Sequence, residues 1–594
     1  MPQELPQLPA GQPNFENLRL ANSAYVDKTM YFPMLKKISD YIFCARPRRF
    51  GKSLTITALD AYFSGRTELF QGLAVERDMN SSEFVTSPVI RLDMGRPAGS
   101  DSKTILQTNI LDPLRDNAKR HGVTLRGADS ARTFFSLISD VHEESGKKVV
   151  VLIDEYDAPV IRIVQMERSL SQKRLLNDTR EIIRDFYSQL KFAAEHIEFV
   201  FITGVTKFSR MGVFSLLNNL FDISLRPEFG EFMGYTQKEL ENYFAPYIKK
   251  TAEELNIGEE KLLKEISRHY DGFSFDGITS LYNPFSVLAF FSERRFDNFW
   301  MESGANAIVR KFLKDNALLA EQFEGMVVNR TFVREPGEID ATPPAGFLYQ
   351  AGYLTLRVRG ENSYSLCYPN SEVREAISTL FLENLALETS WTGIGVAGEE
   401  LKRCLEDADV PGMVDVFIRL FADICYADHS KADLDPADGI LTNIFRKVGL
   451  FLSIFKQRKL NESLAEFFRR KLGEGFYRSI LHSSLCMAGA TVTPERPVGL
   501  GRIDLLAVCG AITYVIELKM AEDAQRRTNG ALAGMSQINE KGYGRAFKNP
   551  ILVSLAIGRK ERNIVACRFK INGQEKVVDI KELEKSSSYQ VEVL

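Results

Sequence analysis

Three short apolar runs in the first half of the chain have the length and composition of buried β-strands. They are Tyr41–Ala45 (YIFCA), Val149–Ile153 (VVVLI) and Phe199–Thr203 (FVFIT). Continuous apolar runs are typical of parallel strands, because helices cover both faces of a parallel sheet. The first run is followed by a polar loop and then by helical spacing of apolar residues over Leu54–Phe63. The pattern predicts an α/β fold in which polar side chains gather at the carboxyl ends of the strands.

Two apolar, β-branched runs near the other end of the chain predict an antiparallel hairpin. They are Arg502–Val508 (RIDLLAV) and Thr513–Lys519 (TYVIELK), and the segment between them contains a glycine. If the hairpin turns at this glycine and the residue after it, Asp504 lies directly opposite Glu517. Opposed residues share one face of a sheet, and Lys519 joins that face by the period-two alternation. The sequence therefore predicts two acids and a lysine on one patch.

The segments around these strands have helical spacing of apolar residues. Helices are expected over most of Phe232–Phe291, over Leu380–Phe468, and over Ala465–Leu485 and Gly530–Tyr543 on the two sides of the C-terminal hairpin. A second hairpin is expected over Gly346–Ser365. The whole pattern describes an α/β multidomain protein, since 594 residues are too many for a single hydrophobic core.

The composition is that of a folded intracellular protein. Hydrophobic residues make up 44% and charged residues 26% of the chain, and the net charge is −3, so any nucleic-acid surface must be local. The seven cysteines are scattered without a C-x-x-C pair, and the six histidines are also scattered, which disfavours disulfides and a zinc site. There is no secretion signal and no apolar run of about 20 residues, so we expect a cytoplasmic protein with no membrane partner.

The loop after the first predicted strand has the composition of a phosphate-binding loop. Gly51-Lys52-Ser53 stands at the start of the predicted helix, where backbone N–H groups and the helix N-terminus attract phosphates. Lys52 is expected to reach the terminal phosphates, and Ser53 is expected to ligate Mg²⁺. The usual motif begins with glycine, but an arginine stands there and restricts the loop to ordinary backbone angles. The residues expected to contact the nucleotide are Arg46, Pro47, Arg48, Arg49, Phe50, Gly51, Lys52, Ser53 and Leu54.

An acidic pair, Asp154-Glu155, follows the apolar run Val149–Ile153. The carboxyl end of such a strand is where α/β sheets place ligands. Asp154 is expected in the Mg²⁺ shell, and Glu155 is expected to orient or deprotonate the attacking water. The alternative is a core strand that ends in a capped loop. The phosphate-binding motif earlier in the chain favours the catalytic interpretation.

The predicted patch of Asp504, Glu517 and Lys519 has the chemistry of a metal site. Opposed carboxylates repel each other unless a cation lies between them. Mg²⁺ prefers oxygen ligands and often takes only one or two protein carboxylates, while water and phosphate oxygens complete its shell. The alternative is a solvated strand face, where an E-x-K sequence is common.

These motifs and several others resemble a known family over most of Tyr25–Arg568. The chain is similar to the bacterial AAA-ATPase-like family, whose members commonly carry a C-terminal PD-(D/E)XK nuclease domain. Asp504 and the E-x-K of Glu517 and Lys519 resemble the D…ExK core of that nuclease superfamily. The family shares the RPRRFGKS form, so Arg46 is no departure from it. The N-terminal resemblance rests on Tyr25–Thr29 (YVDKT), Arg46–Leu54 (RPRRFGKSL), Leu152–Asp157 (LIDEYD), Asn218–Leu220 (NNL), Tyr270–Phe273 (YDGF) and Tyr282–Ser286 (YNPFS).

The resemblance implies further site residues. In AAA-type ATPases a polar residue at the end of the strand beside the acidic one senses the γ-phosphate, which implies Thr203 or Thr206. In the nuclease superfamily, a helix before the hairpin carries an acid that helps to hold metal, which implies Glu474. A residue of the helix after the hairpin lies near the same site, which implies Gln537.

The resemblance also implies a domain organisation and a function. We expect a P-loop AAA-like ATPase core at 15–230, a lid domain at 231–375, a helical connector at 376–460 and a restriction-endonuclease-like α/β domain at 461–594. The implied cofactors are ATP and Mg²⁺, with Mn²⁺ as a substitute at the nuclease site, and the implied partner is nucleic acid, with DNA favoured over RNA. The leading hypothesis is an ATP-regulated, Mg-dependent endonuclease that acts in defence against foreign DNA. The alternative is a nucleotide-dependent switch or scaffold whose C-terminal domain binds nucleic acid or a partner without cleavage. Self-association into a homo-oligomer stays open.

Overall fold

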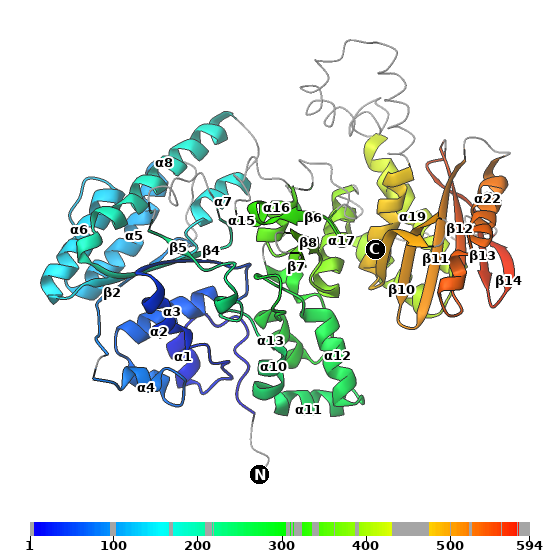
Figure 1. Ribbon diagram of the computed structural model, residues 1–594. Coiled ribbons are helices and arrows are strands. Elements are labelled where there is room, and N and C mark those ends of the chain that lie inside the picture. Colours follow the sequence, from blue (N-terminus) through cyan, green and yellow to red (C-terminus); the bar gives the residue numbers. More distant parts are fainter. Residues whose placement is uncertain are drawn as a thin grey trace, which may run out of the picture. The chain divides into compact units, whose positions relative to one another are not determined.

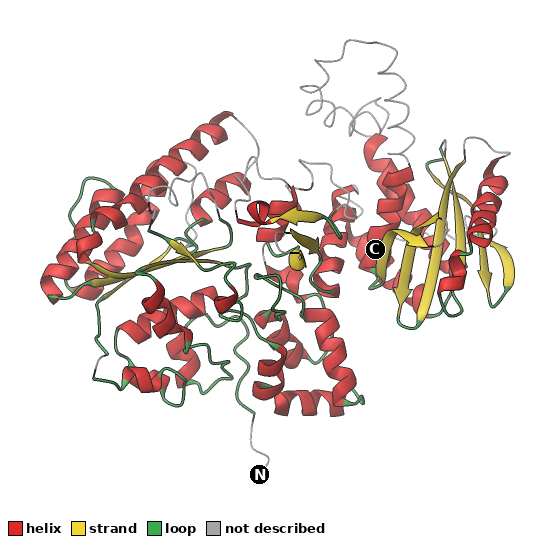
Figure 2. Cartoon of the chain, in the orientation of Figure 1, coloured by secondary structure: helices red, strands yellow, loops and turns green. Residues whose placement is uncertain are grey.

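The computed structural model describes most of the chain. The described residues are 5–82, 84–95, 103–165, 170–207, 217, 219–303, 309–310, 313, 323–334, 344–360, 363–385, 391–429, 474–498, 501–521, 526–559, 561–578 and 580. They form two compact units, the first made of Met1–Ile308 and Phe323–Glu372 and the second of Val309–Gln322 and Val373–Leu594. Figure 2 shows separate sheets flanked by helices in each unit.

A five-stranded parallel sheet forms the centre of the first unit. Its order is β2-β3-β4-β1-β5, so that one strand, β4, separates β1 from β3. All six residues of β3 are buried, as expected for a parallel strand with a continuous apolar sequence. The three apolar runs are therefore β1, β3 and β4, and the predicted α/β fold is confirmed. The strands are β1 (Tyr41–Ala45), β2 (Val89–Asp93), β3 (Val149–Asp154), β4 (Ile197–Gly204) and β5 (Phe221–Asp222).

Helices cover both faces of this sheet (Figure 1). On one face, α1, α2 and α3 share a core with β3 and β4 that includes Phe32, Leu59 and Leu152. On the other face lie α5, α6 and α8, and the rings of Phe134 and Phe186 stack there between α6 and α8. The helices are α1 (Phe15–Leu20), α2 (Tyr31–Ile38), α3 (Lys52–Phe63), α4 (Glu76–Met79), α5 (Lys103–His121), α6 (Ser130–Ser145), α7 (Ala158–Gln165) and α8 (Leu170–Phe192), with 3₁₀ turns η1 (Thr67–Phe70), η2 (Ala194–His196) and η3 (Pro227–Phe229).

Four helices with their own core follow, as predicted for 232–291. A capping box of Thr236 and Glu239 starts α10, and Asn283 caps α13 ahead of a proline in its first turn. The core between these helices includes Phe244, Ile266 and Phe290. The elements are α10 (Gln237–Tyr243), α11 (Ala245–Glu254), α12 (Glu259–Tyr270), α13 (Pro284–Glu293) and the 3₁₀ turn η4 (Phe299–Ser303).

A small antiparallel sheet of order β6-β8-β7 completes the first unit. The hairpin expected over Gly346–Ser365 is found only from the start of β7, because the residues before it form α16. Ala345, Leu348 and Ala351 are buried there at helical spacing. The elements are β6 (Val327–Asn329), α15 (Arg330–Arg334), α16 (Pro344–Gln350), β7 (Thr355–Gly360) and β8 (Ser363–Cys367).

The second unit contains a six-stranded mixed sheet of order β14-β13-β12-β11-β10-β9. Strands β11 and β12 are parallel, and the other neighbours are antiparallel. The predicted hairpin register is confirmed, since Leu505 pairs with Ile516 and Cys509 pairs with Ile512. The strands are β9 (Thr491–Val498), β10 (Gly501–Cys509), β11 (Ile512–Ala521), β12 (Ile551–Gly558), β13 (Asn563–Ile571) and β14 (Gln574–Val578).

Helices cover this sheet on both faces as well. On one face, α18, α19 and a helix over 474–487 share a core with β10 to β13 that includes Leu401, Phe417, Leu481 and Ile516. On the other face, α22 packs Met535 and Ile538 against β10 and β11. The helices expected as a connector thus belong to the core of the C-terminal sheet. The elements are α17 (Ser371–Leu385), α18 (Trp391–Glu406), α19 (Val410–His429), α22 (Arg526–Lys541) and the 3₁₀ turn η7 (Tyr543–Ala546).

Within the described part of the chain, no helix has the length and apolar character that a membrane crossing requires.

Removing the side chain of Phe417 tests the packing of α19 on the C-terminal sheet. Phe417 is fully buried, so Phe417→Ala is expected to lower the free energy of unfolding of this unit by about 3–5 kcal/mol. The matched control is Val396→Ala on α18, an exposed site where the change is expected to stay within about 0.5 kcal/mol. The measurement is chemical denaturation followed by circular dichroism. Equal small losses in the two variants would contradict the packing.

Candidate functional site

The loop between β1 and α3 is held in shape by aromatic rings from the helical region. Gly51 stands just before α3 with φ 87°, and Arg49 has φ 67°, which is costly for a residue with a side chain. The Arg49 guanidinium lies 4.3 Å from the centroid of the Phe285 ring. The Phe50 ring lies 5.0 Å from the ring of Phe273 and 5.3 Å from that of Phe275. These contacts hold the strained loop in place before any ligand binds.

Arg46 supports the loop from beneath. Its side chain is buried and donates hydrogen bonds to the carbonyl oxygens of Ala45, Ser224 and Phe229. Its backbone N–H donates to the carbonyl of Gly204. The sequence-based prediction placed Arg46 among the residues that contact nucleotide. In the structure its Nη1 and Nη2 donate to protein carbonyls and its Nε is buried without a hydrogen-bond partner, so these contacts assign Arg46 to the shape of the loop.

Lys52, Ser53 and Asp154 come together at the start of α3 and the end of β3. Lys52 is only 6% exposed, and its Nζ donates to the carbonyl of Pro47 at 2.8 Å. Burial lowers the pKa of Lys52, while Asp154 acts in the opposite direction. Burial raises the pKa of Asp154 to about 6, and a hydrogen bond from Ser53 opposes that rise. A hydroxyl and a carboxylate in contact beside a buried lysine suit an Mg²⁺ ion bound to phosphates.

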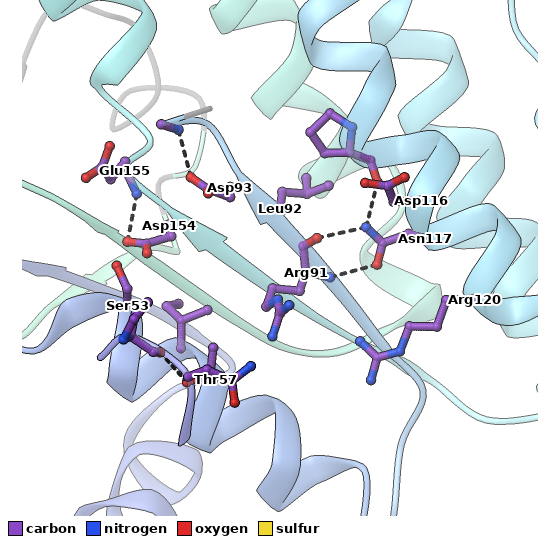
Figure 3. A pocket seen from close by; sticks show the side chains of 15 residues that line it. Ser53, Thr57, Arg91, Leu92, Asp93, Asp116, Asn117, Arg120, Asp154 and Glu155 are labelled. Carbon is purple, nitrogen blue, oxygen red and sulfur yellow. Dashed lines mark hydrogen bonds between the residues drawn. The ribbon is translucent and has the colours of Figure 1, made fainter. Parts of the chain in front are cut away.

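Glu155 lies at the rim of a cavity of about 440 Å³ (Figure 3). Its backbone has φ 50°, and its N–H donates to Asp154 Oδ1 at 2.9 Å. Asp93, at the end of β2, accepts the N–H of Gly95 at 2.8 Å. A Cβ at Gly95 would overlap the Glu155 carboxylate in its present position, so a larger residue there would require the Glu155 side chain to move. Arg162 donates to the carbonyl of Gly95 and fixes this turn.

The two threonines proposed as γ-phosphate sensors are bound to the protein. Thr203 Oγ1 donates to the carbonyl of Cys44 on β1 at 2.8 Å. Thr206 Oγ1 donates to Asp157 Oδ2 at 2.5 Å, and Asp157 also accepts the N–H groups of Val205 and Thr206. In the structure both hydroxyl groups donate to protein acceptors, and their role as γ-phosphate sensors stays a prediction. The Thr203 hydroxyl links β4 to β1, and the Thr206 hydroxyl links the segment after β4 to Asp157.

Sequence reasoning missed Asp157 and Asp93. Asp157 is buried, and burial raises the pKa of its carboxyl while hydrogen bonds from Thr206 oppose that effect. Its signal in the sequence was the second aspartate of LIDEYD. Asp93 follows an apolar strand, as Asp154 does, and the two residues pair in register across β2 and β3.

The predicted patch in the second unit is built on the carboxyl half of β11. Asp504 Oδ2 accepts the backbone N–H of Leu518 at 2.8 Å, which ties the two strands together beyond their paired residues. Lys519 Nζ donates to Glu517 Oε1 at 2.9 Å. The Glu517 side chain is 1% exposed, and its second oxygen, Oε2, is buried with no hydrogen-bond partner. A buried carboxylate oxygen without a partner is costly and suits a bound cation.

The pKa shifts of the acids in this patch also suit a bound cation. Burial and the neighbouring Asp504 raise the pKa of Glu517 to about 7. Burial also raises the pKa of Asp504. Burial would lower the pKa of Lys519, but its hydrogen bond to Glu517 raises it overall. Among the described residues, no three His, Cys, Asp or Glu side chains are grouped as metal ligands, so an ion here would rest on two carboxylates and on water.

Gln537 and Glu474 flank this pair. Gln537 Nε2, on α22, donates to Glu517 Oε1 and lies 3.5 Å from the hydroxyl of Tyr543, a residue that sequence reasoning missed. A Cβ at Gly534 would overlap the Ser554 side chain, so glycine lets α22 approach the sheet closely enough for this contact. Glu474 is the first described residue of the helix over 474–487, and burial and Asp504 raise its pKa.

Two regions of the chain match known protein families. Residues 9–214 match the family described as "Predicted AAA-ATPase", and residues 472–567 match the "PD-(D/E)XK nuclease superfamily". The chain is 29% identical over 574 residues to an "Uncharacterized protein in vnfD 5'region" of Azotobacter chroococcum mcd 1. That alignment covers 94% of this chain and 98% of the relative. Each matched region contains one of the two sites described above.

Replacing Glu517 by its amide is expected to stabilise the metal-free protein in a pH-dependent way. The folded-state pKa of Glu517 is about 7, above its ordinary value of 4.5, so ionisation of the buried group destabilises the fold as the pH rises between these values. Glu517→Gln should therefore raise the melting temperature in EDTA most above pH 7 and progressively less toward pH 4.5. Added Mg²⁺ should stabilise the wild type more than the variant.

The matched control is Glu540→Gln, an exposed position on α22, where no such pH-dependent gain is expected. A gain for Glu517→Gln that does not change with pH would contradict the raised pKa of this carboxyl.

Proposed function

We propose that this chain, which carries an AAA-ATPase-like domain and a C-terminal PD-(D/E)XK nuclease-superfamily domain, is an ATP-regulated, Mg-dependent endonuclease. The observation that carries the proposal is the buried Glu517 oxygen without a partner, next to Asp504 and Lys519. This donor set matches a divalent ion that keeps most of its shell for water and phosphate. We further propose nucleic acid, with DNA favoured over RNA, as the substrate.

Each residue of the second site has a proposed task. Asp504 and Glu517 are the metal ligands, and Mn²⁺ would also suit their oxygens. A divalent ion bound there would stabilise the charge that develops on a phosphate under attack. Lys519 keeps its ammonium beside Glu517 and positions the attacking water. Gln537 fixes the orientation of the Glu517 carboxylate, and Glu474 adds a nearby acid that can bind a water of the metal shell.

The first site is proposed to bind and hydrolyse ATP. Lys52 lies at the N-terminus of α3 and needs only to leave the Pro47 carbonyl to reach a phosphate. Ser53 and Asp154 are the proposed Mg²⁺ ligands. Glu155, at the cavity rim, is proposed to orient the attacking water. The loop from Pro47 to Leu54 would surround the phosphates with backbone N–H groups.

The biological role is proposed from the pairing of the two activities. An ATPase and a nuclease on one chain allow cleavage to depend on nucleotide state, which suits defence against foreign DNA in the cytoplasm. Regulation requires that nucleotide changes the population of a cleavage-competent state.

The ATPase part is tested by two substitutions with different expected outcomes. Lys52→Ala should abolish ATP hydrolysis, because it removes the charge directed at the phosphates. Glu155→Gln should keep nucleotide binding but slow hydrolysis by about 100-fold or more, because the amide cannot accept a proton. The measurements are phosphate release and binding of a fluorescent ATP analogue. Lys191→Ala, an exposed lysine on α8, is the control and should behave as wild type. Wild-type hydrolysis in Lys52→Ala would exclude the proposed nucleotide site.

The nuclease part is tested with plasmid, linear duplex and single-stranded substrates in Mg²⁺. Wild type should cut at least one of them, and Asp504→Asn and Lys519→Ala should each lower the rate by about 100-fold or more. Lys570→Ala, on β13, is the control and should cut normally. Each protein is assayed without nucleotide and with ADP, ATP or a non-hydrolysable analogue. Equal cleavage rates in all four conditions would reject regulation by ATP. If the protein binds nucleic acid but cuts no substrate, the alternative function of a nucleotide-dependent switch or scaffold is favoured.

A further inference from the structure

Two arginines beside the second site are joined by one carboxylate. Arg478 Nη1 donates to Glu495 Oε1 at 2.9 Å, and Arg502 Nη1 donates to Glu495 Oε2 at 3.4 Å. The side chains of Arg478, Glu495 and Arg502 are 18%, 48% and 69% exposed. The cluster therefore opens to solvent, and one carboxylate faces two guanidinium groups.

The backbone places this cluster next to Asp504. On β9 and β10, Ile503 pairs with Arg496 and Leu505 pairs with Pro494, so Glu495 stands across from Asp504. Glu495 has φ 46°, a left-handed angle that interrupts the regular pairing at this point.

The helix over 474–487 brings the second arginine to the same place. Arg478 is one helical turn after Glu474, so the two side chains share a face. Burial raises the pKa of Asp504, and among the nearby charges Arg478 lowers it while Glu495 raises it. The same charges act on Glu474. The cluster thus lies within electrostatic reach of the proposed metal-binding acids.

The charges near this site create a problem for a polyanionic substrate. Asp504, Glu517 and Glu474 would repel a phosphodiester backbone, and Lys519 is already bound to Glu517. Guanidinium groups bind carboxylates and phosphates in the same planar geometry, so a carboxylate between two arginines occupies the position that a phosphate would take.

We propose that Arg478 and Arg502 bind the phosphodiester backbone of the nucleic-acid substrate beside the cleavage site, and that Glu495 holds both arginines until a phosphate replaces it. The inference rests on the proposed nuclease function and adds its substrate-binding residues. Glu495 thereby lowers the affinity for nucleic acid, while the arginines raise it. A purely structural ion pair would instead make all three substitutions act in the same direction.

The test is binding of a fluorescent 20-base-pair DNA duplex, and of the RNA duplex of the same sequence, to the full chain in Ca²⁺ at several salt concentrations. Arg478→Ala and Arg502→Ala should each weaken binding about three- to tenfold and reduce the slope of log K against log salt by about 1. Glu495→Gln should tighten binding by a similar factor. Preference between the two duplexes identifies the backbone that is bound.

The matched control is the ion pair of Arg568 and Glu575 on β13 and β14, which are 3.1 Å apart. Arg568→Ala and Glu575→Gln should leave affinity and salt slope unchanged. Because Arg478 is largely covered, Arg478→Lys is included, and it should keep the salt slope while losing part of the affinity. Melting temperatures report the fold of each variant.

The outcomes separate this inference from the proposed function. Mg²⁺-dependent cleavage that needs Asp504, together with wild-type affinity and salt slope in both Arg→Ala variants, would overturn the inference alone. Weaker binding in Glu495→Gln would overturn the role of Glu495 as a competing carboxylate. A wild-type chain that neither binds nor cuts nucleic acid would overturn the inference and the proposed function together.

Discussion

The burial of carboxylates that outnumber their cationic partners is the interaction on which both sites depend. In the second unit, Lys519 donates to Glu517, Asp504 accepts the N–H of Leu518, and Oε2 of Glu517 has no partner. In the first unit, the carboxyl group of Asp154 is buried beside Lys52, whose own charge is almost wholly covered. Such groups are costly to bury unless a cation joins them. Under the proposed function, a divalent ion at each site would offset this cost.

The fold offsets this cost with rigid support placed behind the sites. Gly534 lets α22 lie close to the sheet, so Gln537 reaches Glu517. In the first unit, Nη1 and Nη2 of Arg46 donate to protein carbonyls beneath the loop between β1 and α3, and the Phe50 ring contacts those of Phe273 and Phe275. A strained loop and a pair of repelling acids persist because their surroundings allow few alternatives.

The sequence predicted those features that depend on local periodicity. The hairpin register followed from a glycine and an alternating pattern, because a strand has only two faces and a short turn fixes the pairing. The parallel strands followed from continuous apolar runs, one of which is followed by the acidic pair Asp154-Glu155. Features that depend on distant residues were not predictable. The hydrogen bond of Thr203 to Cys44 and the carbonyl partners of Arg46 arise from tertiary packing.

The packing partner of the helices over 391–429 was also not predictable from the sequence. Their apolar spacing indicated a buried face but not the surface that it covers, and that surface is the C-terminal sheet. The start of the second hairpin was placed too early for a related reason. A short apolar segment is compatible with either a strand or a helix. Here the buried residues Ala345, Leu348 and Ala351 recur at helical spacing, and the segment forms α16.

The most direct test of the central claim is a crystal structure of the full chain grown with Mn²⁺, in which anomalous scattering locates the ion. We expect an anomalous peak bonded to oxygens of both Asp504 and Glu517, with Glu517 Oε2 among the ligands. A well-ordered site with no ion between these carboxylates, or with the two carboxylates pointing to opposite faces of the sheet, would contradict it.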